Sequence, residues 1–237
     1  MQFVLIHGGW QGGWCWDGVA DELRRKGHDV FAPTMRGSES GQADRAGVTL
    51  SNMADRVARD LADRDLHDVV AVGHSGGGPV IQLLHEADPT RFERLIFIDA
   101  WVLNDGQSIY DILNRELVQS LQAAADASPD RTIPMPREFW FGALMNDLSA
   151  EEASPWFDRT VPCPEGWLTD KVKLPTFAKA TVPTSYVFLQ EDVTVPKEIY
   201  QANASRLRKP KTTEAPGSHE AMLSRPLELA AAILRVC

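Results

Sequence analysis

Cysteine is scarce in this sequence, and its scarcity limits the classes of protein that fit. Only three cysteines occur, Cys15, Cys163 and Cys237, and none belongs to a CxxC pair or a cluster of ligand residues. They cannot form the disulfide framework of a small secreted domain or the ligand set of a structural zinc site. We therefore expect a cytoplasmic protein without a metal ion.

Excess positive charge and long hydrophobic runs are also lacking. The 24 Lys and Arg against 33 Asp and Glu give a net charge of -9, which argues against nucleic acid or an anionic membrane as a partner. No apolar run approaches the roughly 18 residues that a membrane span needs. The first residues, MQFVLIHGG, lack a basic n-region and read as a strand from the second residue, so we expect no signal peptide.

Short apolar runs alternate with amphipathic stretches along the chain. The runs lie at residues 3–6, 29–32, 69–72, 95–98, 185–189 and, more weakly, 212–215. Each is nearly all apolar, which is typical of a parallel strand covered on both faces. Residues at helical spacing, such as Met53, Val57 and Leu61, lie between the runs. The alternation predicts a doubly wound α/β fold with a mainly parallel sheet.

The alternation stops between residues 101 and 180. This interval contains helical pieces, proline-rich turns and many aromatic residues, but no convincing strand. We therefore expect a core made of residues 1–100 and 181–237, with a mostly helical cap at 101–180 inserted after the fourth strand.

A nucleophile motif follows the third run. Residues 70–78 read VAVGHSGGG, which contains the pattern G-x-S-x-G. A serine in a sharp turn between strand and helix needs neighbours without side chains, because the backbones come close together there. Its oxygen then faces the carboxyl end of the sheet, where open α/β sheets bind ligands. Ser75 is the expected nucleophile, and the alternative is a bystander serine in a glycine-rich turn.

A base and an acid are expected later in the chain, in the order nucleophile, acid, histidine. His219 lies between the last predicted strand and the last helix, and is the expected base. Asp192, after the fifth strand, is the first choice for the acid that fixes the histidine tautomer and stabilises the imidazolium. Glu191 and Asp99 stay as alternatives, and any of the three acids could instead be a turn or capping residue.

Two backbone amides are expected to stabilise an oxyanion. One belongs to Gly76, directly after the nucleophile, and the other to Gly9 in the loop after the first strand. A phosphate-binding loop would be the alternative, but the sequence has no GxxxxGK and no acid after the second strand for a dinucleotide ribose.

With these residues in place, the chain resembles the plant-type methylesterase and hydroxynitrile lyase family of α/β-hydrolases and its bacterial esterase relatives. The resemblance rests on four blocks in order along the chain, VLIHGGWQGGWCW, VGHSGGG, QEDVTVP and GSHEAMLSRP, and on NDLSAEEASPWFDRTVPCPEGWLTDKV within the predicted cap. It implies a six-stranded sheet without the first two strands of larger hydrolases. It also implies a triad of Ser75, Asp192 and His219, with Gly9 and Gly76 as oxyanion donors.

Two positions depart from the lyase branch of this family. Its cyanohydrin-cleaving members carry a threonine in the first loop and a lysine after the catalytic histidine, where this sequence has Gly8 and Glu220. A lysine stabilises departing cyanide and a glutamate does not, so the resemblance favours ester hydrolysis. Glu220 either points inward and raises the pKa of His219, or lies exposed in the first turn of the last helix.

A largely apolar substrate pocket is expected near these residues, because all seven tryptophans lie in the first loop and its helix or in the predicted cap. Such aromatic residues more often pack a cap onto a sheet than contact a ligand. The candidate pocket residues are Trp10, His74, Trp101, Phe139, Trp140, Glu220 and Met222.

These predictions define a serine hydrolase that cleaves a carboxylic ester, thioester or lactone of a small, largely apolar substrate through an acyl-enzyme. No cofactor is expected. A cofactor-free lyase or oxygenase with His219 as base is the alternative, and a silent receptor is disfavoured because no triad member is missing. The expected partner is a small-molecule ester, and a homodimer is left open.

Overall fold

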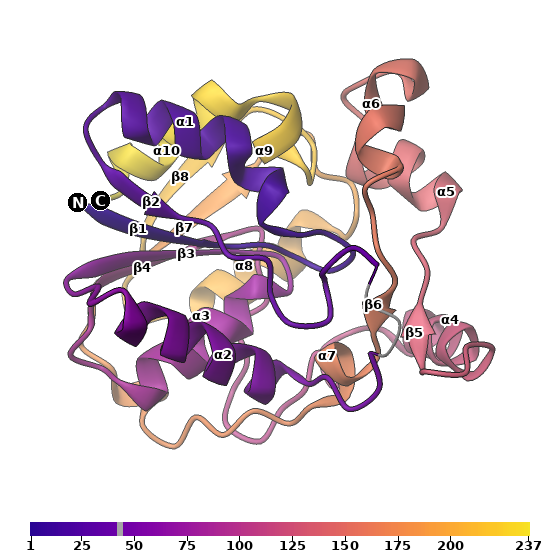
Figure 1. The fold of residues 1–237 in the computed structure, drawn as a ribbon, viewed down its shortest axis with the longest axis horizontal. Helices are drawn as coiled ribbons and strands as arrows, with labels where there is room; N and C mark the ends of the chain where they lie inside the picture. Colours follow the sequence, from indigo (N-terminus) through magenta and orange to yellow (C-terminus); the bar gives the residue numbers. More distant parts are fainter. Residues whose placement is uncertain (42–44) are drawn as a thin grey trace.

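A six-stranded parallel sheet forms the centre of the molecule. The computed structural model describes residues 1–41 and 45–237, and its strand order is β2-β1-β3-β4-β7-β8 (Figure 1). The strands are β1 (Gln2–Ile6), β2 (Asp29–Phe31), β3 (Val69–His74), β4 (Phe92–Ile98), β7 (Thr184–Leu189) and β8 (Lys211–Ala215). Every neighbouring pair runs parallel. The predicted doubly wound fold is confirmed, with strand ends that differ by a few residues.

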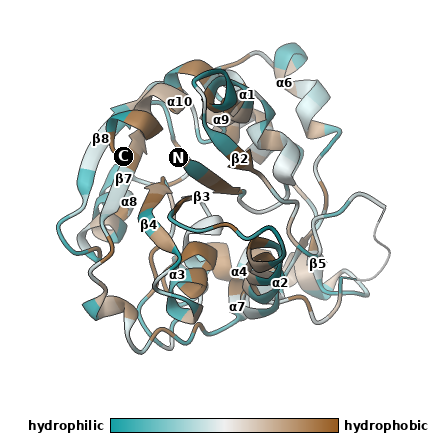
Figure 2. Ribbon diagram, turned by 60° about the vertical axis from the view of Figure 1, so that its left-hand side comes forward, coloured by the Kyte–Doolittle hydropathy of each residue, from teal (hydrophilic) through white to brown (hydrophobic). Residues whose placement is uncertain are grey.

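Helices cover both faces of this sheet (Figure 1). One face is covered by the 3-10 helix η1 (Gly13–Trp16), α1 (Asp17–Arg25), α9 (Ala221–Ser224) and α10 (Pro226–Arg235). The other is covered by α2 (Leu50–Asp63), α3 (Gly77–Ala87) and α8 (Lys197–Ser205). In Figure 2 the central strands are largely hydrophobic, whereas the edge strand β8 is hydrophilic along much of its length.

The continuous apolar runs follow from this two-sided covering. Along β1, Phe3 and Leu5 pack in the cluster beneath α1 and α10, whereas Val4 and Ile6 pack in the cluster beneath α2 and α3. Successive side chains of a strand point to opposite faces. Because both faces are dry, the four buried positions of β1 are all apolar, and the polar Gln2 stands at its partly exposed start.

The segment between β4 and β7, called the β4–β7 segment below, contains most of the irregular structure. Its main elements lie on the side to which the carboxyl ends of the strands point (Figure 1). They are α4 (Arg115–Asp126), β5 (Thr132–Ile133), α5 (Arg137–Phe139), the π-helix η2 (Trp140–Leu144), α6 (Ala150–Phe157), β6 (Cys163–Pro164) and α7 (Gly166–Thr169). The 3-10 helix η3 (Phe177–Lys179) instead packs against the end of α3, where the ring of Phe177 lies edge-on to that of His85.

The expectation of no strand in this segment is wrong. The short strands β5 and β6 pair antiparallel, with Ile133 opposite Cys163. A strand of two residues has no hydrophobic period to detect, because it depends on a partner far away in sequence. We call this pair the β5–β6 ribbon.

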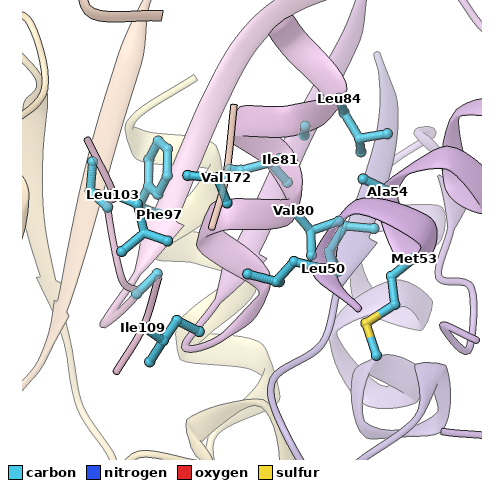
Figure 3. Close-up of a cluster of buried hydrophobic side chains, with 14 of the residues drawn as sticks. Leu50, Met53, Ala54, Val80, Ile81, Leu84, Phe97, Leu103, Ile109 and Val172 are labelled. Atoms are coloured by element: carbon cyan, nitrogen blue, oxygen red, sulfur yellow. The ribbon is translucent and has the colours of Figure 1, made fainter. Parts of the chain in front are cut away.

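Both ends of the β4–β7 segment pack into the main core. Leu103, Ile109 and Val172 belong to the same buried cluster as Val80 and Ile81 of α3 (Figure 3). The middle of the segment forms a second, smaller cluster, which contains Met135, Trp140, Leu144, Met145 and Ala153. The predicted cap boundaries at 101 and 180 stay a prediction, because the packing changes gradually along the segment.

The start of α3 provides a test of this packing. A Cβ added to Gly78 would lie 2.2 Å from the carbonyl oxygen of Trp101, which is backbone and cannot rotate away. Gly78→Ala should therefore lower the free energy of unfolding by about 1–3 kcal/mol, as overpacking does. Urea denaturation followed by circular dichroism measures the change.

The matched control is Gly142→Ala in η2, where no atom lies within 4 Å of the added Cβ. Alanine is the better helix former, so this variant should be neutral or more stable by up to about 1 kcal/mol. Equal effects of the two substitutions would contradict the close contact between α3 and Trp101.

Candidate active site

Ser75 lies in a strained turn between β3 and α3. Its φ of 51° is in the left-handed region, which costs a residue other than glycine roughly 1–2 kcal/mol. The turn also depends on small neighbours, because a Cβ on Gly73 would lie 2.7 Å from the carbonyl oxygen of Gly77, and one on Gly77 would lie 2.7 Å from that of Ile6. The motif therefore forms the expected elbow, with a half-buried serine at its tip.

The predicted base and acid are hydrogen bonded. His219 Nδ1 lies 2.5 Å from Asp192 Oδ2, and their side chains are 6% and 1% exposed. Asp192 Oδ1 accepts two more hydrogen bonds, from the backbone N–H of Thr194 at 2.8 Å and from its hydroxyl at 2.6 Å. Burial alone would raise the pKa of Asp192, but the charge and hydrogen bond of His219, aided by Thr194, hold it below its ordinary range.

The two alternative acids have other partners. The carboxylate of Glu191 accepts a hydrogen bond from the backbone N–H of Gly217, so it fixes the loop that precedes His219. Asp99 Oδ2 accepts a hydrogen bond from the N–H of Leu189 at 3.0 Å. Burial, and then the charge of Asp192, raise the pKa of Asp99 well above its ordinary value. Its surroundings therefore favour the neutral form of Asp99 beside Asp192.

The histidine loop lies against the nucleophile elbow. The ring of His74, directly before Ser75, lies 4.5 Å from the ring of His219, measured between centroids. Burial lowers the pKa of His74 well below its ordinary value, so this ring is neutral. A Cβ added to Gly8 would lie 3.0 Å from Ser75 Cβ and 3.1 Å from His74 Nδ1. Residue 8 therefore faces the nucleophile.

The loop after β1 is held by a histidine with a fixed tautomer. His7 Nε2 accepts the N–H of Met35 at 3.1 Å, so Nδ1 carries the proton and donates it to the carbonyl oxygen of Gly8 at 2.8 Å. Burial lowers the pKa of His7 to about 4. In the described part of the chain, no acceptor takes the backbone N–H of Gly9 or Gly76. Both amides are available to an oxyanion.

The predicted pocket residues differ in exposure. Trp10, Trp101 and Phe139 are partly exposed, whereas Trp140 and Met222 are 0% and 1% exposed and lie inside hydrophobic clusters. A substrate could reach these two only if their neighbours moved. The composition of the pocket stays a prediction.

Glu220 is buried, which excludes the hypothesis of an exposed residue in the last helix. It is 2% exposed and precedes the short helix α9, and its N–H donates to the carbonyl oxygen of Leu144 at 3.1 Å. Burial raises the pKa of Glu220 to about 7. Burial would lower the pKa of His219, but Asp192 and then Glu220 raise it to about 9.

Two further searches cover the described residues, 1–41 and 45–237. Among them, no three His, Cys, Asp or Glu side chains are arranged to hold a metal ion. No helix formed by them is long and apolar enough to cross a membrane.

Comparison with known proteins assigns the chain to a family. The model of a family described as the alpha/beta hydrolase family matches residues 3–232. The chain belongs to this family. This α/β-hydrolase is also similar in structure to an extracellular α/β-hydrolase from a Paenibacillus species, described as sharing structural and functional homology with tobacco salicylic acid binding protein 2. The TM-score is 0.93 at 32% identity, over 100% of this chain and 98% of the other.

Relatives found by sequence carry esterase names. A carbendazim hydrolyzing esterase from a Nocardioides species is 35% identical over 122 residues, which is 51% of this chain. Putative methylesterase 13, a chloroplastic protein of Arabidopsis thaliana, is 25% identical over 240 residues, or 96% of this chain. The alignments span 50% and 54% of the lengths of these two relatives. Each alignment therefore covers about half of the relative's own length.

Three contacts around the site were not predicted from the sequence. They are the hydrogen bonds of Thr194 to Asp192, the hydroxyl of Tyr200 at 3.3 Å from His219 Nδ1, and the indole of Trp167, which donates to Gly76. Thr194 had a local signal, since Asp often bonds to the residue two positions ahead. Tyr200 and Trp167 had none, because only the fold brings them to the site.

The burial of Glu220 generates a prediction on the ionisation of His219. In the wild type, His219 should titrate near pH 9, where Glu220 is ionised and stabilises the imidazolium. Glu220→Gln removes that charge, so the pKa of His219 should fall. Ring chemical shifts measured by NMR over a pH series report the change directly.

Glu228→Gln is the matched control, because Glu228 is exposed on α10 and its loss should leave the titration of His219 unchanged. An unchanged titration in Glu220→Gln as well would contradict the effect of Glu220 on the pKa of His219. Glu220 would then have only a structural role at the start of α9.

Proposed function

We propose that this chain hydrolyses carboxylic esters through an acyl-enzyme on Ser75. The observation that carries the proposal is the buried pair of His219 and Asp192, joined at 2.5 Å and lying against the elbow that presents Ser75. The esterase names of the relatives support the same reaction.

The proposed first half of the reaction is acylation. Ser75 Oγ attacks the ester carbonyl while His219, in its neutral form, accepts the hydroxyl proton at Nε2. Because the pKa of His219 is about 9, this neutral form predominates above that pH in the free enzyme. Asp192 keeps the proton of His219 on Nδ1 and stabilises the imidazolium, without becoming protonated itself. The N–H groups of Gly9 and Gly76 donate to the oxyanion of the tetrahedral intermediate.

Acylation ends when His219 gives its proton to the leaving alkoxide and the acyl-enzyme forms. In the second half, deacylation, water enters, His219 removes a proton from it, and the resulting hydroxide attacks the acyl carbon. The second tetrahedral intermediate then collapses, His219 returns its proton to Ser75 Oγ, and the acid is released. No step needs a cofactor.

The proposed substrates are small, neutral and largely apolar esters. Trp10, Trp101 and Phe139 offer partly exposed aromatic surface, which suits an apolar acyl or alcohol group. The buried acid Glu220 beside His219 disfavours anionic substrates and helps to expel a carboxylate product. Thioesters and lactones react by the same steps and belong to the same proposal.

The β4–β7 segment is proposed to act as a cap over the site, within the predicted boundaries 101–180. Its middle part has a hydrophobic cluster of its own. The N–H of Glu220, next to the base, donates to Leu144 in that part.

The scarcity of cysteine supports a cytoplasmic location within this proposal. The proposed chemistry is compatible with either a monomer or a homodimer.

Lyase chemistry on the same scaffold is the weaker candidate. A residue at position 8 faces Ser75, and Gly8 supplies no hydroxyl there, in contrast to the threonine of the cyanohydrin-cleaving branch. Glu220 likewise replaces the lysine of that branch. These two positions favour hydrolysis over cyanohydrin cleavage.

The proposal predicts that Ser75→Ala folds normally and loses several orders of magnitude in kcat, because triad members act as a unit. A fluorophosphonate probe should label the wild type at Ser75 and leave the variant unlabelled. Mass spectrometry of the labelled peptide locates the probe. A variant that keeps more than about a tenth of the wild-type rate would rule out acyl transfer to this residue.

The choice of acid has its own test. Asp192→Asn should lower kcat by about 10⁴-fold, since the wrong histidine tautomer is then favoured. Asp99→Asn and Glu191→Gln should have far smaller effects, because these side chains bond to Leu189 and Gly217 and not to His219. Measurement of kcat for the three variants side by side decides which acid acts with His219. If Asp99→Asn is the inactive variant, the acid lies on β4 and Asp192 has been misassigned.

A further inference from the structure

Trp10 occupies an unfavourable backbone conformation directly after the proposed oxyanion donor Gly9. Its φ is 64°, although a bulky residue in the left-handed region costs roughly 1–3 kcal/mol. Such a conformation persists only where the surroundings hold it. An outlier beside a reacting group is therefore a reason to ask what holds it.

The holding contacts come from the β4–β7 segment. The indole N–H of Trp10 donates to the carbonyl oxygen of Ile133 in β5 at 2.8 Å. The N–H of Val161, two residues before β6, donates to the carbonyl oxygen of Trp10 at 2.9 Å. A Cβ on Gly9 would lie 3.6 Å from the sulfur of Cys163 in β6. The β5–β6 ribbon and the neighbouring Val161 therefore hold the loop after β1 in place at Trp10.

A second indole makes the matching contact on the nucleophile elbow. Trp167 of α7 donates its indole N–H to the carbonyl oxygen of Gly76 at 3.0 Å. It is 1% exposed, and its ring meets the ring of His7 edge-on, with centroids 5.8 Å apart. His7 in turn donates to the carbonyl oxygen of Gly8. Trp167 therefore contacts the nucleophile elbow directly and the loop after β1 through His7.

We propose that Trp10 and Trp167 are positioning residues. Through them the β4–β7 segment holds the N–H groups of Gly9 and Gly76 in the positions from which both can donate to one oxyanion. Trp10 belongs to the core and donates to the β4–β7 segment, whereas Trp167 belongs to that segment and donates to the core. The inference rests on the proposed function, because it assigns the oxyanion hole to Gly9 and Gly76.

Accurate placement of these donors is expected to affect the rate more than binding. Oxyanion donors act on the charge that develops in the transition state, and a donor that is absent lowers kcat by about 10²–10³-fold. A donor that is displaced keeps part of this effect. Loss of an indole N–H should therefore lower kcat by about 10–100-fold, with KM changed by less than about 3-fold.

The test uses Trp10→Phe and Trp167→Phe in the full chain, each of which keeps an aromatic ring and removes the N–H. Trp156→Phe is the matched control, because Trp156 is a partly buried tryptophan of α6 in the same segment with no contact to Gly9 or Gly76. Measurements are kcat and KM on an activated ester, together with the rate of inactivation by a fluorophosphonate.

In the two test variants kcat and the inactivation rate should fall together, while the control keeps wild-type values for both. Wild-type kcat and inactivation rates in Trp10→Phe and Trp167→Phe would overturn the proposal, and so would a change confined to KM. A wild type that the probe does not label would instead reject the proposed function.

If a phenylalanine variant does not fold, benzothienylalanine at the same position preserves the bicyclic shape and lacks only the N–H. The same fall in kcat with this residue supports the positioning role, and an unchanged kcat overturns it.

Discussion

The hydrogen bond between His219 and Asp192 is the interaction on which the chemistry of this molecule depends. Burial opposes the charge on both partners, and each keeps the other ionised. The two donors of Thr194 satisfy the remaining lone pairs of the carboxylate, as a buried charge requires. If either partner were removed, the other would remain buried without compensation. The pair is therefore the most sensitive point of the site.

The carboxyl groups of this site differ in pKa because their surroundings differ. Contacts with His219 and Thr194 lower the pKa of Asp192, whereas burial and the charge of Asp192 raise the pKa of Asp99, which accepts one backbone N–H. Glu220 is intermediate, with a pKa raised to about 7. Environments that separate the pKa values of neighbouring carboxyl groups are typical of catalytic sites. Here they favour the ionised form of Asp192, the acid that is hydrogen bonded to His219.

The fold brings the parts together at one edge. Loops after β1, β3, β7 and β8 carry Gly9, Ser75, Asp192 and His219, and the carboxyl ends of parallel strands meet on the same side of a sheet. Trp10 and Ser75, two of the non-glycine residues with a positive φ, lie at this edge. The β4–β7 segment lies beyond it and supplies contacts to both.

Much of this arrangement could be predicted from the sequence. Apolar runs without alternation identified the strands of a covered parallel sheet, and the glycines around Ser75 identified the elbow, because both signals are local. The pairing of Asp192 with His219 was expected from the order nucleophile, acid, histidine along the chain and from the family resemblance. The β5–β6 ribbon and the contacts of Trp167 could not be predicted, since each depends on a partner distant in sequence. For the same reason the sequence left an inward-pointing Glu220 as one of two hypotheses. Trp10 was expected to line a pocket, and its hydrogen bond to Ile133 adds a contact that no local pattern encodes.

The most direct test of the central claim is a crystal structure of the chain after reaction with a phosphonate ester. The account predicts phosphorus bonded to Ser75 Oγ, a phosphoryl oxygen accepting hydrogen bonds from the N–H groups of Gly9 and Gly76, and His219 still bonded to Asp192. An adduct on another residue, or a phosphoryl oxygen turned away from both amides, would contradict it.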